Sequence, residues 1–143
     1  MLALCTACVN KLRKHNAYGF LCYNACFGPL PFRSFCFLVF STLHTNNASQ
    51  TIDRIIDSFP EGQQDQVRLQ LASTLSGIFS QRLLPRISGG FIPAFELLIN
   101  NNAVSNLIRE ARTHEIDTVI ETGSSNGMID MNRSLADLVR KGE

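Results

Sequence analysis

The chain has 143 residues, of which 45% are hydrophobic and 17% are charged, and its formal net charge is +1. This length suits one ordinary domain with a buried core, and the composition is that of a globular protein and not of a disordered one. A net charge so close to zero gives no basis for binding nucleic acid or an anionic membrane surface, so we expect no nucleic-acid partner.

Charge and cysteine are distributed unevenly along the chain. Residues 1–40 contain no acidic residue, all five cysteines and six of the ten phenylalanines, whereas residues 41–143 contain twelve acidic residues and no cysteine. The apolar run in the first stretch is interrupted by Asn24, Pro29, Pro31 and Arg33, so we expect neither a membrane span nor a signal peptide there. We predict an atypical Cys- and Phe-rich segment over residues 1–36 and the main domain over residues 37–143.

The main domain begins with a predicted strand. Residues 35–42 form a short apolar run rich in aromatic and β-branched side chains, which favours a buried strand, and a polar loop follows. His44 comes directly after this strand, at the end where α/β sheets place their functional groups. The next residues predict a helix that ends at Pro60. Its candidate N-caps are Asn46, Asn47 and Ser49. Its buried face is formed by Ile52, Ile55, Ile56 and Phe59.

Further helices and one hairpin are predicted downstream. A longer helix from about Gln63 carries an apolar stripe of Val67, Leu71, Leu75, Ile78 and Phe79. The glycines of Ser88-Gly89-Gly90 predict a tight turn between strands at 83–87 and 91–99. Three C-terminal helices follow: one capped by Asn101 or Asn102 with Val104, Leu107 and Ile108 on its apolar face, one over 116–120 that ends at Gly123, and one from about Asn126 that buries Met128, Met131, Leu135, Leu138 and Val139.

The first candidate motif is Thr42-Leu43-His44-Thr45. An imidazole at a strand end can donate a hydrogen bond to a terminal phosphate, or to an attacking water, with only modest charge near neutral pH. Taken alone, a histidine in this position is equally compatible with a structural or a simply exposed side chain. The second motif is residues 103–110, which also match an ordinary amphipathic helix with Arg109 and Glu110 in solvent.

Together the two motifs resemble signature segments of the type IV pilus retraction (twitching motility) ATPases, the PilT family of the type II/IV secretion ATPase superfamily. The first resembles the histidine box of that family, Thr-Leu-His-Thr. The second resembles the family pattern Ala-Ile-Arg-Asn-Leu-Ile-Arg-Glu, with Val104 in place of isoleucine and Ser105 in place of arginine. The residues that match this retraction motif are Ala103, Asn106, Leu107, Ile108, Arg109 and Glu110. The resemblance extends over about residues 37–143, and residues 1–36 lie outside it.

The resemblance implies an α/β fold, namely the C-terminal half of a RecA-like P-loop ATPase domain with a helical tail. It implies that His44 senses nucleotide with support from Thr42 and Thr45, and that residues 103–110 serve pilus retraction beyond ATP hydrolysis itself. It also implies a homo-hexameric ring or intact homologous subunits as partners, a pilus inner-membrane platform protein, and a cytoplasmic location peripheral to the inner membrane. ATP and Mg²⁺ are the cofactors of intact family members.

The parts that would hold a triphosphate are not found in the sequence. A phosphate-binding loop needs glycines followed by Gly-Lys-Ser/Thr, but the chain has no Gly-Lys pair. The first acidic residue is Asp53, whereas the Mg²⁺-ordering carboxylates of the family precede the histidine box. We therefore expect no tight cofactor binding and no ATPase activity by this chain alone. The alternatives are a non-catalytic interaction module or a truncated gene remnant of a type II/IV secretion ATPase.

The cysteines raise a zinc alternative. The pairs Cys5-x₂-Cys8 and Cys22-x₃-Cys26 are separated by nearly the spacing of a four-thiolate zinc site. Zinc sites usually lie among polar and turn residues, and the second pair here has the looser three-residue gap. We expect no metal site, with these four cysteines as the alternative.

Overall fold

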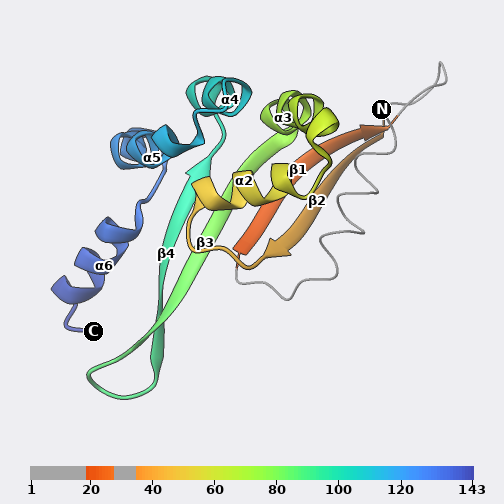
Figure 1. Ribbon diagram of the computed structural model, residues 1–143. Coiled ribbons are helices and arrows are strands. Elements are labelled where there is room, and N and C mark those ends of the chain that lie inside the picture. The colour runs from red at the N-terminus through yellow and green to blue at the C-terminus, as the bar shows by residue number, and fades with distance from the viewer. Residues whose placement is uncertain (1–18, 28–34) are drawn as a thin grey trace.

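The computed structural model describes residues 19–27 and 35–143, which form a four-stranded sheet with helices packed on it (Figure 1). The order across the sheet is β2-β1-β3-β4, so β2 and β4 are its edges. All three strand pairings are antiparallel. The strands are β1 (Gly19–Phe27), β2 (Phe35–Leu43), β3 (Leu75–Pro85) and β4 (Phe91–Ile99).

The helices follow the strands in two places. α2 and α3 connect β2 to β3, and the C-terminal helices come after β4, with α6 lying beside that strand (Figure 1). The bounds are α2 (Ala48–Asp57), α3 (Glu61–Thr74), α4 (Asn102–Arg109), α5 (Ile116–Thr122) and α6 (Met131–Arg140), with 3₁₀ turns η1 (Thr113–Glu115) and η2 (Gly123–Asn126). Over the described residues, no helix has both the length and the apolar character needed to cross a membrane.

Several predicted elements are confirmed. The strand predicted over 35–42 is β2, and the helix predicted after it is α2, with Asn47 as its N-cap. Asn101 caps α4, α5 ends before Gly123, and the glycine turn joins β3 to β4. Gly89 and Gly90 adopt φ angles of 91° and 81°, the left-handed region that glycine enters at little cost.

The prediction for the long helix was wrong in its second half. α3 ends at Thr74, and Leu75, Ile78 and Phe79 belong to β3. The apolar spacing of these residues fits a helix, but β3 pairs along its length with β4, and tertiary pairing overrides the local pattern. The two strands approach closely at Gly77, where a Cβ atom would lie 2.7 Å from the carbonyl oxygen of Leu98 on β4.

The prediction for the last helix was wrong at its start. α6 begins at Met131, where the Asp130 side chain accepts a hydrogen bond of 2.9 Å from the backbone N–H of Arg133. The preceding residues leave the helical path at Gly127, whose φ is 81°, and then form a bridge between Ile129 and Leu97 of β4. Met128 is buried as predicted but lies outside the helix, whereas Val139 is 76% exposed and was predicted to be buried.

The N-terminal segment contributes a strand to the sheet. The sequence analysis predicted no element over residues 19–27, yet their backbone forms β1 between β2 and β3. Of the zinc alternative, Cys5 and Cys8 lie outside the described residues, and Cys22 and Cys26 are described only as backbone positions of β1. The boundary predicted near residue 36 stays a prediction.

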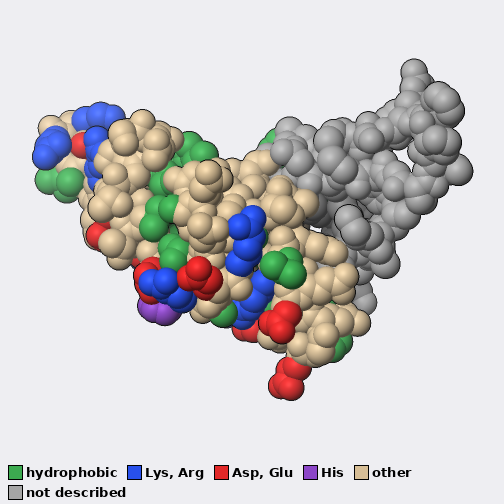
Figure 2. Space-filling model, turned by 90° about the horizontal axis from the view of Figure 1, so that it is seen from above, with side chains coloured by type: hydrophobic (Ala, Val, Ile, Leu, Met, Phe, Trp, Pro, Cys, Tyr) green, Lys and Arg blue, Asp and Glu red, His purple; other side chains and the backbone are tan. Residues whose placement is uncertain are grey.

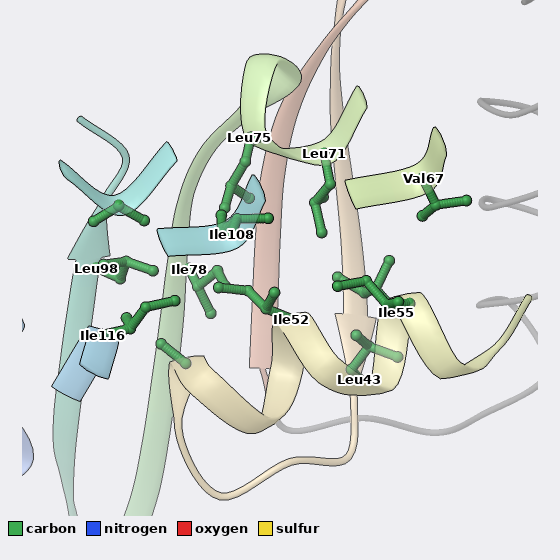
Figure 3. Close-up of a cluster of buried hydrophobic side chains, with 14 of the residues drawn as sticks. Leu43, Ile52, Ile55, Val67, Leu71, Leu75, Ile78, Leu98, Ile108 and Ile116 are labelled. Atoms are coloured by element: carbon green, nitrogen blue, oxygen red, sulfur yellow. The ribbon is translucent and has the colours of Figure 1, made fainter. Parts of the chain in front are cut away.

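One hydrophobic core lies between the sheet and the helices (Figure 3). Ile52 and Ile55 of α2 point into it, together with Ile78 of β3, Leu98 of β4 and Ile108 of α4. Ile52, Leu98 and Ile108 are each 0% exposed. Burying such side chains stabilises the fold by about 1.5–3 kcal/mol each, so α2 is held against the sheet by its apolar face.

Candidate functional site

The histidine motif lies in the turn that joins β2 to α2. Leu43 is buried at the end of β2, and His44, the next residue, is exposed. The hydroxyls of Thr45 and Thr51 are 2.6 Å apart, and Thr51 Oγ1 donates to the backbone carbonyl of Asn47 at 2.9 Å. The turn is therefore tied to the first turn of α2 by the side chain that follows His44.

The N-terminus of α2 has two side-chain acceptors. Asn47 Oδ1 accepts from the backbone N–H of Gln50 at 3.1 Å, as an N-cap does. Glu96 Oε1, on β4, accepts from the backbone N–H of Ala48 at 2.8 Å. These bonds satisfy donors that a helix start otherwise leaves without partners.

A pocket of about 450 Å³ opens beside the turn. Arg54 of α2, Arg82 of β3 and His44 are among the residues that line it, and Arg82 also donates to the carbonyl of Asn46 at 3.4 Å. The remaining lining residues are Thr45, Asn46, Gln50, Gln81 and Leu83, so the lining contains no carboxylate. Guanidinium groups pair with phosphate and carboxylate oxygens, so the pocket suits an anion.

The sequence analysis grouped Thr42 with His44, and the structure places it elsewhere. Thr42 is half-buried within β2 and is not among the residues that line the pocket. Of the three predicted nucleotide-sensing residues, His44 and Thr45 therefore come together at the pocket.

Glu96 is a buried carboxyl group on a mostly apolar strand, with 7% of the residue exposed. Burial raises its pKa above the ordinary value for glutamate, and the hydrogen bond from Ala48 opposes this rise. The charged groups that act on it are Asp117 of α5 and Asp130 before α6, which raise the pKa further, and Arg82 of β3, which lowers it.

We expect Glu96→Gln to change the dependence of stability on pH. Because the folded-state pKa of Glu96 lies above its unfolded value, the stability linked to this group is present at pH values below the unfolded pKa and is lost as pH rises through the folded pKa. Glutamine keeps an acceptor for Ala48 and has no ionisation. The variant should therefore gain stability relative to wild type as pH rises above 4.5, the ordinary pKa of glutamate, as measured by urea denaturation at a series of pH values.

Glu115→Gln is the matched control for this prediction. Arg112 Nε donates to Glu115 Oε1 at 2.7 Å, and this hydrogen bond lowers the pKa of Glu115. The pH dependence therefore has the opposite sign: wild type should gain stability relative to Glu115→Gln as pH rises. A Glu96→Gln curve parallel to wild type at every pH would contradict the assignment of Glu96.

The predicted retraction motif forms α4 and its C-terminal end. Ile108 is buried and Leu107 is half-buried against the core, whereas Ala103, Asn106, Arg109 and Glu110 are exposed. Arg109 donates to Asn106 Oδ1 at 3.0 Å, and Glu110 pairs with Arg112 at 3.0 Å. Figure 2 shows acidic and basic side chains next to one another on this side of the molecule, with no large patch of one sign.

Ser105 stands where the expected retraction motif has arginine, and it has its own structural role. Its hydroxyl donates to the carbonyl of Ala72 in the last turn of α3 at 2.8 Å. Asn100 Nδ2 donates to the same carbonyl at 3.1 Å and to that of Leu75 at 2.9 Å. The junction of β4 and α4 therefore caps the C-terminus of α3, where carbonyls lack intrahelical partners.

The histidine turn and α4 are separate sites, linked through α2. At the middle of α2, Asp53 Oδ1 accepts at 2.8 Å from Thr113 Oγ1, three residues beyond the predicted retraction motif. Among the described residues, no group of three or more His, Cys, Asp or Glu side chains could hold a metal ion.

Sequence reasoning missed the roles of Arg54, Arg82 and Glu96. Glu96 had a visible signal, because it is the single charge in the otherwise apolar strand β4. A charge in such a strand usually has a specific partner. The two arginines had no comparable signal, because they come from α2 and β3 and only the fold brings them beside His44.

Comparison with known proteins identifies homologues of part of this chain, although no family model matches it. The chain is 47% identical over 106 residues to a twitching motility protein of Neisseria gonorrhoeae, covering 73% of this chain and 28% of that protein. It is 43% identical over 105 residues to the type IV pilus retraction ATPase PilT of Pseudomonas aeruginosa, covering 73% of this chain and 30% of that protein.

A solved structure gives the same result. The crystal structure of the pilus retraction motor PilT with bound ADP matches 71% of this chain and 28% of that chain, with 48% identity and a TM-score of 0.62. The chain thus spans less than a third of the length of these relatives. The predicted α/β fold, as part of a pilus ATPase domain, is confirmed.

Proposed function

Because the chain belongs to the family of the type IV pilus retraction ATPases, we propose that it is the nucleotide-sensing and force-transmitting part of such a motor. The observation that carries this proposal is the pocket in which His44 lies with Arg54 and Arg82 and no carboxylate. A pocket lined by two arginines and a histidine, with no carboxylate, suits the terminal phosphate of a nucleotide. ADP is bound in the related PilT motor.

In this proposal His44 reports on the terminal phosphate, and Thr45 holds the turn in place. An imidazole donor aimed at a developing negative charge contributes to catalysis without supplying the nucleophile. The segment 103–110 then transmits the conformational response to nucleotide to the partners of the chain. These partners are a hexameric ring of homologous subunits and the inner-membrane platform of the pilus. ATP and Mg²⁺ would bind where an intact subunit supplies the phosphate loop.

The chain alone is proposed to be inactive. Its sequence has no Gly-Lys pair and its first carboxylate, Asp53, is engaged by Thr113. The purified chain should therefore show no magnesium-dependent ATP turnover. Turnover that is lost on His44→Ala would contradict this part of the proposal.

A chimera tests the sensing role. In it, residues 37–143 replace the aligned segment of the Pseudomonas PilT, so that the phosphate loop comes from the intact relative. His44→Ala should lower its ATP turnover by about 10²–10³-fold, the usual effect of removing one oriented donor. His114→Ala is the matched control, because this exposed histidine lies in η1 and not at the pocket.

The two variants give opposite expectations. Turnover of the His114→Ala chimera should stay close to that of the unsubstituted chimera. Equal turnover for the His44→Ala chimera would remove the basis for a sensing role. Co-migration of the chain with intact PilT subunits in size-exclusion chromatography tests the proposed ring partner.

A further inference from the structure

We propose that Glu96 is a positioning residue for His44, because its carboxylate on β4 fixes the helix end of the turn that carries the histidine. The inference rests on the proposed function, since only a sensing role makes the placement of His44 matter for activity. Glu96 itself does not line the pocket, so it acts through the backbone of the turn.

The anchor is a single buried hydrogen bond between distant parts of the sequence. Glu96 Oε1 accepts from the N–H of Ala48 at 2.8 Å across 48 positions of sequence. Ala48 is 0% exposed and Glu96 is 7% exposed, so water has little access to replace the bond. Loss of the acceptor would leave a buried donor without a partner, which is costly for a fold.

The bond fixes one end of the short segment that contains His44. His44 lies between two buried residues, Leu43 at the end of β2 and Ala48 at the start of α2. Packing in the core holds Leu43 (Figure 3), and the bond to Glu96 holds the backbone of Ala48. With both ends held, the few residues between them have little freedom, and the imidazole stays at the pocket.

The anchor also connects the His44 turn to β4, the strand that precedes the predicted retraction motif. β4 carries Glu96 and ends at Ile99, and Asn101 then caps α4. A shift of β4 relative to α2 would therefore act on both the His44 turn and the start of α4. This connection follows from the bond and does not require direct contact between the two motifs.

Three variants of the full chain separate positioning from stability. Glu96→Met removes the acceptor at similar side-chain length, and Glu96→Gln keeps an acceptor. Thr113→Val removes a different hydrogen bond to α2, the 2.8 Å bond to Asp53, and is the matched control for a loss of stability away from the turn. The readouts are amide hydrogen exchange of Ala48 and the NMR signals of the His44 ring.

We expect Glu96→Met to lower the exchange protection of the Ala48 amide by about tenfold or more, as for a buried donor without an acceptor. The His44 ring signals should shift in the same variant. Glu96→Gln should restore both readouts, and Thr113→Val should leave the His44 signals at their wild-type positions. If Glu96→Met does not fold, Glu96→Asp, which withdraws the carboxylate by one methylene, replaces it with the same expectation.

Wild-type protection of Ala48 and unchanged His44 signals in the acceptor-free variant would overturn the inference. Equal shifts of His44 in Thr113→Val would also overturn it, because the effect would then be one of general stability. These readouts need no motor activity. A chimera insensitive to His44→Ala refutes the proposed function, whereas an unmoved His44 in Glu96→Met refutes the positioning role alone.

Discussion

Replacing Ile52 with alanine is expected to lower the free energy of unfolding by about 2–5 kcal/mol. Ile52 is 0% exposed and lies on the buried face of α2, where it meets the side chains of the sheet and of α4 (Figure 3). The substitution removes apolar contacts and leaves a cavity between packed elements that can close only in part. Urea denaturation at neutral pH measures the change.

The matched control is Leu69→Ala on α3. Leu69 is 57% exposed and is not part of the core, so its loss should change stability by no more than about 0.5 kcal/mol. Similar losses in the two variants would mean that α2 does not pack as the structure shows. Because α2 begins next to the histidine turn, the Ile52 variant should also weaken any function of His44.

Gly77→Ala is expected to destabilise the protein by about 1–3 kcal/mol, the usual cost of forcing extra atoms into a packed site. The added Cβ would lie 2.7 Å from the carbonyl oxygen of Leu98, which is backbone and cannot rotate away. β3 would have to move from β4 at the place where the two strands cover the core. Thermal denaturation followed by circular dichroism measures the effect.

Gly62→Ala serves as the comparison for Gly77. Gly62 lies in the first turn of α3, and a Cβ there would meet no atom within 4 Å. The substitution should raise stability by about 0.4–1 kcal/mol, because alanine loses less backbone freedom on folding. A Gly77→Ala protein as stable as Gly62→Ala would show that β3 and β4 do not approach as closely as described.

The local signals in the sequence were read correctly where neighbouring residues decide the structure. Asn47 and Asn101 were among the candidate caps, because a side chain that accepts from the third residue of a helix is a local interaction. The glycine pair at 89–90 was recognised as a turn for the same reason. The apolar face of α2 has a period that only a helix satisfies.

The same reasoning failed where distant partners decide. Leu75, Ile78 and Phe79 have helical spacing, but they pair as a strand: Leu75 with β1, and Ile78 and Phe79 with β4. Met128 was correctly predicted to be buried, but the bridge between Leu97 and Ile129 excludes its segment from the last helix. Neither pairing can be read from a window of sequence, because it depends on distant segments of the chain.

The sequence by itself indicated the resemblance to the pilus retraction ATPases and the two candidate motifs with His44 and residues 103–110, since these depend on which residues stand next to one another in the chain. Only the tertiary structure decided which side chains join them. It brings Arg54 and Arg82 to the His44 pocket, leaves Thr42 outside it, and places Glu96 against the start of α2. The physical reason is that hydrogen bonds and charge act over a few ångströms of space, whatever the separation along the chain.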